Sequence, residues 1–325
     1  MFAGDFYAPR KIRLVDIPLE EARVSAQPGE PRVLFEPKLA CLCGSDLLFY
    51  EGDYPEYRPH VGQSLHEMVG EVVESECERF RPGDRVLTVP YEHFGFYQRY
   101  WVAASRVIPL DPRPSPAEAL MSQPLGTVVY ALKSLPSVLD RDVAVMGQGP
   151  MGLLFTAALR NLGARHVIGV DPVAERREVS RIMGATEVID PEDANVAEAV
   201  AEITDGGADI VIEAVGHREQ VLPQCVSSCR PRGTILFFGV PTETIDGVPM
   251  REAFLKNLRV VTSVNPDFRR DFPLAMRWIG EGRLDVSPLI THRYPLEQIE
   301  AAFELFHGKR EGAVKVLIEI DSFAS

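Results

Sequence analysis

The stretch Val143-Ala144-Val145-Met146-Gly147-Gln148-Gly149-Pro150-Met151-Gly152 decides the fold of this chain. Its first four residues are apolar and suit a buried strand, and its end opens a segment with apolar side chains at helical spacing. Gly147 permits a tight turn, Gly149 lets the backbone approach a pyrophosphate, and Gly152 lets helix and strand pack closely. Unpaired N–H groups at the start of the helix attract phosphates. The pattern therefore predicts a dinucleotide-binding turn.

An acidic residue ends the next expected strand. Asp171 follows the glycine turn by about 20 residues, where a carboxylate accepts hydrogen bonds from the ribose hydroxyls of NAD and repels the 2′-phosphate of NADP. Arg176 and Arg177 come shortly afterwards, and an arginine that reached back could hold NADP. We interpret both as solvated charges on a helix face, because they lie beyond the strand end. The sequence thus predicts NAD rather than NADP.

Short apolar runs and helical stretches alternate from this motif onward. Such alternation is typical of a doubly wound parallel sheet. The expected strands are residues 143–147, 167–171, 187–190, 210–213, 234–239 and 260–264. The expected helices are residues 151–162, 174–183, 196–203 and 220–229. The sequence therefore predicts an α/β protein with a Rossmann-type sheet of six parallel strands.

The rest of the chain has a different texture. Residues 1–112 contain short strand-like runs divided by Pro and Gly, and residues 116–134 have apolar side chains at helical spacing. From residue 272 onward a helix, a strand, a helix and a strand are expected. A chain of 325 residues is long for one compact domain. We expect a nucleotide-binding domain at 123–264 and a β-rich catalytic domain from 1–122 and 265–325.

Composition and charge disfavour several classes of protein. The net charge is −13 at pH 7, whereas nucleic acids and anionic membranes recruit basic surfaces. No apolar run approaches the roughly 20 residues that span a bilayer, and the first residues lack the core of a signal peptide. Five cysteines do not describe a disulfide framework, which favours a reducing compartment. We expect a soluble cytoplasmic protein with a small-molecule substrate.

Thiol and imidazole side chains stand close in sequence within the β-rich region, as Cys43-Gly44-Ser45-Asp46 and His66-Glu67. Thiolate and imidazole are ligands that Zn²⁺ prefers, and they supply two of the three that an open catalytic site needs. Ser45 could relay a proton from a metal-bound alcohol, and Asp46 could orient the imidazole. The alternative is a buried cysteine, a turn capped by Ser and Asp, and a hydrogen-bonded histidine.

With the glycine motif, these residues resemble the medium-chain dehydrogenase/reductase superfamily, most closely its zinc-dependent alcohol and polyol dehydrogenases of the sorbitol and threonine type. The resemblance covers essentially the whole chain. The similar motifs are Cys43-Gly44-Ser45-Asp46, Pro82-Gly83-Asp84-Arg85-Val86, Gln123-Pro124-Leu125 and Val211-Ile212-Glu213-Ala214-Val215-Gly216. The resemblance implies a GroES-like catalytic domain, and a homodimer or homotetramer joined around residues 234–239 and 258–264.

The resemblance also implies roles for particular residues. Cys43 and His66 would bind catalytic zinc, Ser45 would relay the proton, and Asp46 would support the histidine. The metal-ligand candidates are Cys43, His66, Glu67 and Gln123. The cofactor-binding candidates are Gly147, Gly149, Pro150, Met151, Gly152, Asp171, Arg176 and Val215. The candidate substrate-pocket residues are Phe49, Tyr54, Tyr57, His60 and His93.

The chain departs from the family pattern near its candidate metal site. Residues 87–95, without a cysteine, replace the lobe that holds a structural zinc, so we expect one catalytic zinc and no structural zinc. Leu65 replaces the glycine before the histidine, and Gln123 replaces a common Cys or Glu ligand, so Glu67 is an alternative ligand. Leu48 replaces a histidine that ends the proton relay in many relatives, which leaves His60 or His93 as substitutes.

Our leading hypothesis is a zinc- and NAD-dependent dehydrogenase that transfers a hydride from a secondary alcohol of a polyol, aminocyclitol or sugar-like substrate. The first alternative is a zinc-free NAD(P)H-dependent reductase of enones or quinones, and Cys43 with His66 counts against it. The second is a non-catalytic NAD-binding protein, motivated by Leu48, Leu65 and Gln123. The presence of Ser45 beside Cys43 favours an enzyme.

Overall fold

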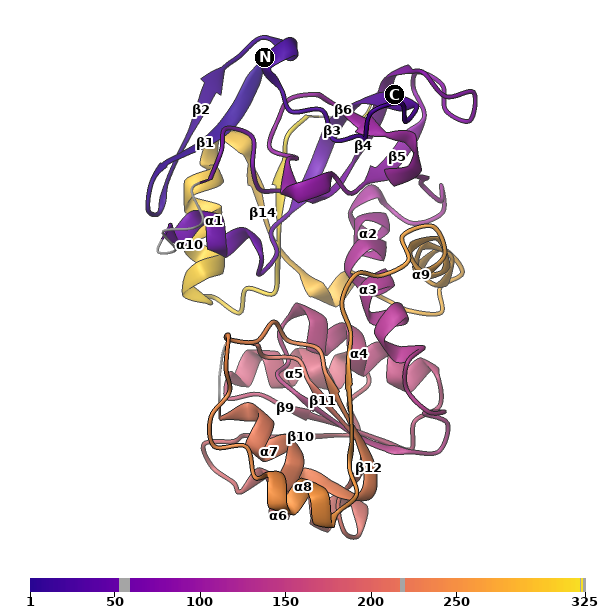
Figure 1. Ribbon diagram of the computed structural model, residues 1–325, viewed down its shortest axis with the longest axis vertical. Coiled ribbons are helices and arrows are strands. Elements are labelled where there is room, and N and C mark those ends of the chain that lie inside the picture. Colours follow the sequence, from indigo (N-terminus) through magenta and orange to yellow (C-terminus); the bar gives the residue numbers. More distant parts are fainter. Residues whose placement is uncertain (53–58, 217–219, 322, 324–325) are drawn as a thin grey trace. The chain divides into compact units, whose positions relative to one another are not determined.

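The structure is a computed structural model, and it describes residues 1–52, 59–216, 220–321 and 323 (Figure 1). The chain divides into two compact units. Unit 1 comprises Met1–Gln123 and Ile290–Ser325, and unit 2 comprises Pro124–Leu289. The division after Gln123 lies one residue beyond the expected boundary, whereas the return to unit 1 comes at Ile290 and not at residue 265.

Residues 265–289 thus lie in unit 2, and their assignment to the catalytic domain was wrong. Helix α9 (Asp271–Gly280) packs closely on helix α3 (Ser122–Leu132). A Cβ atom at Gly126 would lie 2.1 Å from the Phe272 ring, so the absence of a side chain permits this approach. Lys133 adds an ion pair with the buried Asp271. The contact joins segments far apart in sequence, so local pattern carried no sign of it.

Unit 2 contains the expected parallel sheet. Its strands are β8 (Asp142–Met146), β9 (His166–Val170), β10 (Glu187–Ile189), β11 (Ala208–Glu213), β12 (Cys229–Phe237) and β13 (Arg259–Thr262). The strand order is β10-β9-β8-β11-β12-β13 and every pairing is parallel, which confirms the doubly wound six-stranded sheet. The other helices are α4 (Pro150–Asn161), α5 (Ala174–Ile182), α6 (Val196–Thr204), α7 (Val221–Ser228) and α8 (Met250–Leu255). The central strands are almost wholly buried, as a sheet covered on both faces requires.

Unit 1 is β-rich, as expected. Its strands are β1 (Phe2–Ala8), β2 (Lys11–Asp16), β3 (Arg32–Cys41), β4 (Glu67–Ser75), β5 (Arg85–Thr88), β6 (Tyr100–Ala103), β7 (Val107–Pro109), β14 (Ile290–Pro295) and β15 (Lys315–Glu319). The larger sheet has the order β14-β15-β3-β4-β5-β7, with β6 on β3, so the end of the chain pairs directly with the strand before Cys43. Its helices are α1 (Asp46–Glu51), α2 (Pro116–Leu120) and α10 (Ile299–Gly308). Short 3₁₀ turns are η1 (Leu19–Glu21), η2 (Tyr91–His93), η3 (Ala104–Arg106), η4 (Ser287–Leu289, in unit 2) and η5 (Leu296–Gln298).

The helix expected over residues 116–134 is two helices, α2 and α3. Ser115 and Glu118 form a capping box that starts α2. The chain breaks at Met121 and restarts at Ser122, two residues before Pro124. A proline ring is tolerated in the first turn of a helix but would clash inside a continuous one, which explains the break. None of the described helices is long and apolar enough to cross a membrane.

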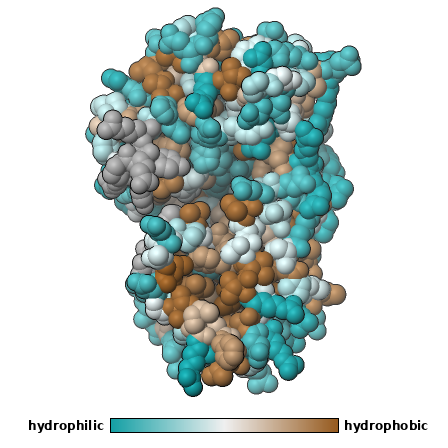
Figure 2. Space-filling view, viewed as in Figure 1, coloured by the Kyte–Doolittle hydropathy of each residue, from teal (hydrophilic) through white to brown (hydrophobic). Residues whose placement is uncertain are grey.

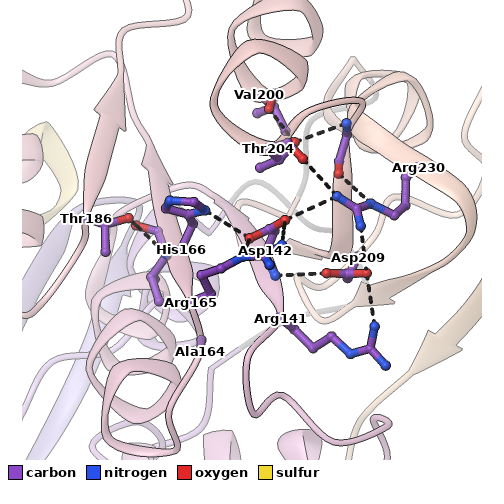
Figure 3. Close-up of polar contacts among 12 residues, drawn as sticks. Arg141, Asp142, Ala164, Arg165, His166, Thr186, Val200, Thr204, Asp209 and Arg230 are labelled. Atoms are coloured by element: carbon purple, nitrogen blue, oxygen red, sulfur yellow. Dashed lines mark hydrogen bonds and ion pairs between the residues drawn. The ribbon is translucent and has the colours of Figure 1, made fainter.

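A network of charged side chains connects the amino ends of neighbouring strands in unit 2 (Figure 3). The fully buried Asp142 carboxylate on β8 accepts hydrogen bonds from Arg165 at 2.6 and 2.8 Å and from Arg230 at 3.1 Å, and its Oδ1 lies 2.9 Å from Nδ1 of His166. Arg230 on β12 also pairs with Asp209 on β11 at 3.2 Å. Burial alone would raise the pKa of Asp142, but the contacts with Arg165 and His166 outweigh it and lower that pKa. The network therefore joins four neighbouring strands at the edge opposite the glycine turn.

Candidate active site

The glycine turn joins β8 to α4 and has the backbone that its sequence predicts. Gly147 has φ 89°, and a Cβ on Gly152 would lie 1.8 Å from the carbonyl oxygen of Gly147, so both positions require glycine. Gly149 differs, because a Cβ there would meet within 4 Å just one side-chain atom, Nη1 of Arg176, at 3.8 Å. The turn is thus open at Gly149, on the side where a pyrophosphate would approach. Pro150 and Met151 follow as the first residues of α4.

Asp171 lies directly beside this turn. Its carboxylate is buried and accepts hydrogen bonds from the backbone N–H of Gln148 at 2.8 Å and of Val173 at 2.9 Å. The interpretation of Arg177 as a solvated charge was wrong: it donates to the carbonyl oxygens of Asp171 and Pro172 and pairs with Asp190 at 2.7 Å. The guanidinium of Arg177 is therefore engaged at the strand end.

Two buried polar side chains of the nucleotide turn, quoted above within their motifs, have roles that the sequence analysis did not assign. The Gln148 amide donates to the carbonyl oxygens of Val145 and Gly147 and accepts from the hydroxyls of Thr156 and Ser180, each at 2.9 Å. In the sequence, Gln148 could have been noticed as a polar residue inside an otherwise apolar and glycine-rich stretch.

The second is Glu213, whose carboxylate accepts from the backbone N–H groups of Val215, Gly216 and Gly239 at 2.9–3.1 Å. Val215 thereby lies against the glycine turn, since a Cβ on Gly147 would fall 2.7 Å from its Cγ2.

The candidate metal ligands meet at the paired ends of β3 and β4. Cys41 is opposite Glu67 in the antiparallel register, which brings Cys43 and His66, just beyond the strand ends, to one place. Cys43 Sγ lies 3.7 Å from His66 Nε2, and one ligand atom from each of Cys43, His66 and Glu67 lies within 4.8 Å of the others. Thiolate, imidazole and carboxylate are the three donor types that zinc accepts. The donor set therefore fits a zinc ion.

Asp46 organises the backbone around these ligands. It is fully buried, and its carboxylate accepts from Cys43 N at 2.8 Å, Ser64 Oγ at 2.8 Å and Leu65 N at 2.9 Å. Its Oδ1 lies 3.9 Å from Nδ1 of His66, a buried atom without a hydrogen-bond partner among the described residues. Burial raises the pKa of the Asp46 carboxyl. The contacts with His66, Cys43 N and Ser64 lower that pKa by more than burial raises it, so the net shift is downward.

The remodelled turn before His66 has a strained backbone. Ser64 has φ 105° and Leu65 has φ 56°, the left-handed region that glycine adopts without a steric penalty. This explains why glycine suits the position of Leu65 in the related pattern. A non-glycine residue there costs of order 1–3 kcal/mol. The fully buried Leu65 side chain and the hydrogen bond from its N–H to Asp46 offset that cost.

Lys315 on β15 also belongs to the site, although the sequence analysis missed it. Its Nζ lies 2.5 Å from Oε2 of Glu67, and both side chains are buried. Burial lowers the pKa of Lys315, but the nearby Cys41 and Glu67 outweigh this and raise it. The ion pair allows the carboxylate of Glu67 to be buried and engages one of its oxygens. In the sequence, Lys315 is a single lysine in an apolar strand. Its pairing with Glu67 can be recognised only when the strands that lie beside β15 are known.

Ser45 and Gln123, the remaining candidates, lie at the starts of two helices. Ser45 precedes α1, and its hydroxyl lies 2.9 Å from Sγ of Cys43. Gln123 is the second residue of α3 and is buried. The assignment of Gln123 as a metal ligand stays a prediction.

The shortened loop after β5 carries His93, whose ring stacks on that of His66 with centroids 4.3 Å apart. Burial, with a smaller contribution from His66, lowers the pKa of His93 to about 4. Beside it is a cavity of about 420 Å³. Its lining residues are Arg23, Phe49, His60, Gln63, Glu92, His93 and Phe94. Phe49, His60 and His93 were expected there, whereas Tyr54 and Tyr57 lie outside the described residues.

The chain is similar in sequence and in fold to known dehydrogenases. Residues 29–111 match the family model described as "Alcohol dehydrogenase GroES-like domain", and residues 150–281 match "Zinc-binding dehydrogenase". An L-threonine 3-dehydrogenase of Pyrococcus horikoshii is 27% identical in an alignment that covers 90% of this chain and 93% of that protein. A sorbitol dehydrogenase of Bacillus subtilis is 24% identical, with 98% and 97% covered. An alcohol dehydrogenase structure from Thermus sp. ATN1 has a TM-score of 0.86 at 25% identity, with 98% of this chain and 100% of that chain covered.

Proposed function

We propose that this chain, which belongs to the medium-chain dehydrogenase/reductase superfamily, uses zinc and NAD to oxidise a polyol, aminocyclitol or sugar-like alcohol. That it is an oxidoreductase transferring a hydride to or from a secondary alcohol follows from its relatives. The observation that carries the proposal is the convergence of the Cys43 sulfur, the His66 imidazole and the Ser45 hydroxyl at one place in unit 1.

Cys43 and His66 would hold the zinc ion, with Glu67 as the third donor within reach. One oxygen of Glu67 is engaged by Lys315, so the other remains to act as a ligand, and Gln123 is the alternative. When bound, zinc supplies a Lewis acid that makes the substrate hydroxyl more acidic. A donor set of one thiolate, one imidazole and one oxygen leaves the open position that such a site needs.

The chain's own residues would then handle the proton and the geometry. Ser45, 2.9 Å from the Cys43 sulfur, would relay the proton of the substrate hydroxyl, releasing its own hydroxyl proton as it accepts that one. Asp46 holds the two ligand-bearing turns together through its hydrogen bonds to Cys43 and Leu65. The neutral NAD ribose is favoured by the buried Asp171 carboxylate, and Arg177 is already engaged by Asp190, which supports NAD over NADP. Arg176, beside Gly149, would offset the pyrophosphate charge.

We also propose a homo-oligomer joined through unit 2, in the cytoplasm. β13 is an edge strand, and apolar side chains gather beside it on the face that carries α8 (Figure 2). The exposed apolar residues of this patch are Val240, Met250, Phe254, Leu255, Val260 and Val264. Exposed edge strands and large apolar patches favour association. The five unpaired cysteines suit a reducing compartment.

Metal content and turnover of matched variants test the proposal. We expect about one zinc per purified chain, since the donor set is that of a single catalytic site. Cys43→Ala should lose both the zinc and the oxidation of polyols with NAD. Ser45→Ala should keep the zinc but lower kcat by about 10²–10⁴-fold, the usual contribution of proton transfer. A protein without zinc that reduces enones or quinones would contradict the proposal, as would Cys43→Ala with full turnover.

A further inference from the structure

The cavity beside His93 is built on the loop that follows β5. All of the described residues that line it belong to unit 1, and Glu92, His93 and Phe94 come from this loop. His93 lines the cavity, and its ring also stacks on that of His66. The cavity is therefore separated by a single imidazole ring from the candidate metal group of Cys43, His66 and Glu67. A volume of about 420 Å³ accommodates a small organic molecule.

Two of the lining residues carry full charges, and they neutralise each other. The guanidinium of Arg23 lies 2.6 Å from Oε2 of Glu92 and 4.7 Å above the Phe94 ring. A carboxylate or phosphate on a ligand would have to share the Arg23 guanidinium with Glu92 and would lie beside that carboxylate. Like charges at such a distance repel each other. The charges of Arg23 and Glu92, the two charged side chains among the described lining residues, therefore offset each other toward an anionic group.

The other polar groups of the lining suit hydroxyl groups. The His60 ring stacks on Phe94 at 6.2 Å, and the His93 ring meets Phe49 edge-on at 5.7 Å. Among the residues that the structure describes, neither imidazole side chain has a hydrogen-bond partner. A neutral imidazole has one N–H donor and one acceptor nitrogen, which matches a hydroxyl group that both donates and accepts. The phenyl rings supply apolar faces for the carbon chain.

We propose that this cavity makes the enzyme prefer neutral substrates to anionic ones. His60 and His93 bind the distal hydroxyl groups of a neutral polyol or sugar. Carboxylated and phosphorylated analogues are disfavoured because Glu92 already pairs with Arg23. The inference rests on the proposed function, since it concerns the same site. His60, His93, Glu92 and Arg23 are then specificity-determining residues of that site.

The variant Glu92→Gln tests the charge selection. It keeps the size of the side chain, removes the carboxylate and leaves the Arg23 guanidinium available to an anion. The measurement is kcat/KM for matched pairs, sorbitol against sorbitol 6-phosphate and 2,3-butanediol against 3-hydroxybutyrate. Where the anionic member is not oxidised, its Ki as an inhibitor of the neutral member replaces kcat/KM. Wild type should prefer the neutral member, and Glu92→Gln should reduce this preference by roughly 10-fold, mainly through KM or Ki, as expected for one new charge-assisted contact.

Glu76→Gln is the matched control. Glu76 forms the same kind of surface pair, with Arg32 at 2.5 Å, away from the residues that line the cavity. The variant Glu76→Gln changes the net charge of the protein by the same amount as Glu92→Gln. Any effect of net charge on the diffusion of charged substrates therefore appears in both variants. The neutral-to-anionic preference of Glu76→Gln should equal that of wild type.

The variants His60→Ala and His60→Gln test the hydroxyl contacts. His60→Ala should raise KM for sorbitol by about 3–10-fold with kcat nearly unchanged, the effect of one lost neutral hydrogen bond. His60→Gln, which keeps a donor and an acceptor, should recover part of the loss. His292→Gln, on β14, is the control with no expected change.

The possible failures are distinct. If wild type oxidises neutral polyols but Glu92→Gln behaves like Glu76→Gln, the cavity does not select charge and the proposed function stands. If wild type prefers the anionic members, the charge selection is wrong and the proposed function again stands. If zinc-loaded wild type oxidises no secondary alcohol with NAD or NADP, the proposed function fails and this inference fails with it.

Discussion

Asp46 is the residue on which the geometry of the candidate metal group depends most. A single buried carboxylate receives the N–H groups of Cys43 and Leu65 and the hydroxyl of Ser64, and so fixes both turns that carry ligands. Its charge is stabilised by donors that converge from both turns, which lowers its pKa despite full burial. Positioning residues behind a metal ligand of this kind contribute about 10–100-fold to metal affinity.

Replacement of Asp46 should therefore weaken zinc binding without removing a ligand. Asp46→Asn places an NH₂ donor where two backbone N–H groups require acceptors. We expect zinc affinity, measured by competition with a chromogenic chelator, to fall about 10–100-fold. Asp84→Asn is the control, because Asp84 also accepts a backbone N–H, from Arg81 at 2.8 Å, but in an exposed turn of the same unit. Unchanged zinc affinity in Asp46→Asn would refute the positioning role.

At the scale of the elements, the strands of unit 2 are joined at both ends by buried polar groups. Gln148 and Glu213 satisfy backbone groups around the glycine turn at the carboxyl ends, and Asp142 links four strands at the amino ends (Figure 3). Parallel strands leave unpaired backbone groups at both of their ends, and each buried polar group there needs a hydrogen-bond partner. The polar residues at the strand ends therefore stabilise the sheet on which the nucleotide site is built.

The Asp142 network predicts a particular dependence of stability on pH. The pKa of Asp142 is lowered in the folded protein, so its stabilisation is complete above the unfolded pKa of about 3.9 and is lost as the pH falls through the lower folded value. Asp142→Asn should lose about 2 kcal/mol at pH 7, because it removes the charged acceptor of Arg165 and His166, whereas Arg230 keeps its ion pair with Asp209. The difference in unfolding free energy from wild type should shrink below pH 4.

Denaturant unfolding at several pH values measures this difference. Asp246→Asn, a substitution at an exposed aspartate of the same unit, is the control and should change stability by less than about 0.5 kcal/mol. An Asp142→Asn variant whose deficit is constant from pH 7 to pH 3 would show that the charge of Asp142 does not stabilise the sheet.

At the scale of the whole molecule, the apolar patch beside β13 predicts where copies of the chain associate. Leu255 and Leu139 are each 66% exposed, and both lie in unit 2, but Leu255 belongs to the apolar patch beside β13. Leu255→Glu should shift the mass measured by light scattering toward that of a single chain, because it places a charge in the proposed interface. Leu139→Glu should leave the mass unchanged. If both variants keep the mass of wild type, the patch is not the interface.

The sequence alone predicted the parts of this protein that depend on local pattern. The glycine turn requires a positive φ at Gly147 and a bare Cα at Gly152, and short apolar strands alternating with helices permit few arrangements other than a doubly wound sheet. Cys43, Ser45, Asp46 and His66 were recognisable because few side chains suit zinc and proton transfer. Such signals are short in sequence, so they can be read without knowing the tertiary structure.

Only the tertiary structure decided which distant residues complete the site. Lys315 pairs with Glu67 because β15 lies beside β3, a pairing between segments more than half the chain apart. The cavity of Arg23, Glu92 and His93 likewise forms where separate loops meet, and α9 joins unit 2 through its contact with Gly126. The physical reason is that packing and ion pairing act between neighbours in space. Local propensity and periodicity are properties of neighbours along the chain, and they carry no record of which strands and loops will meet.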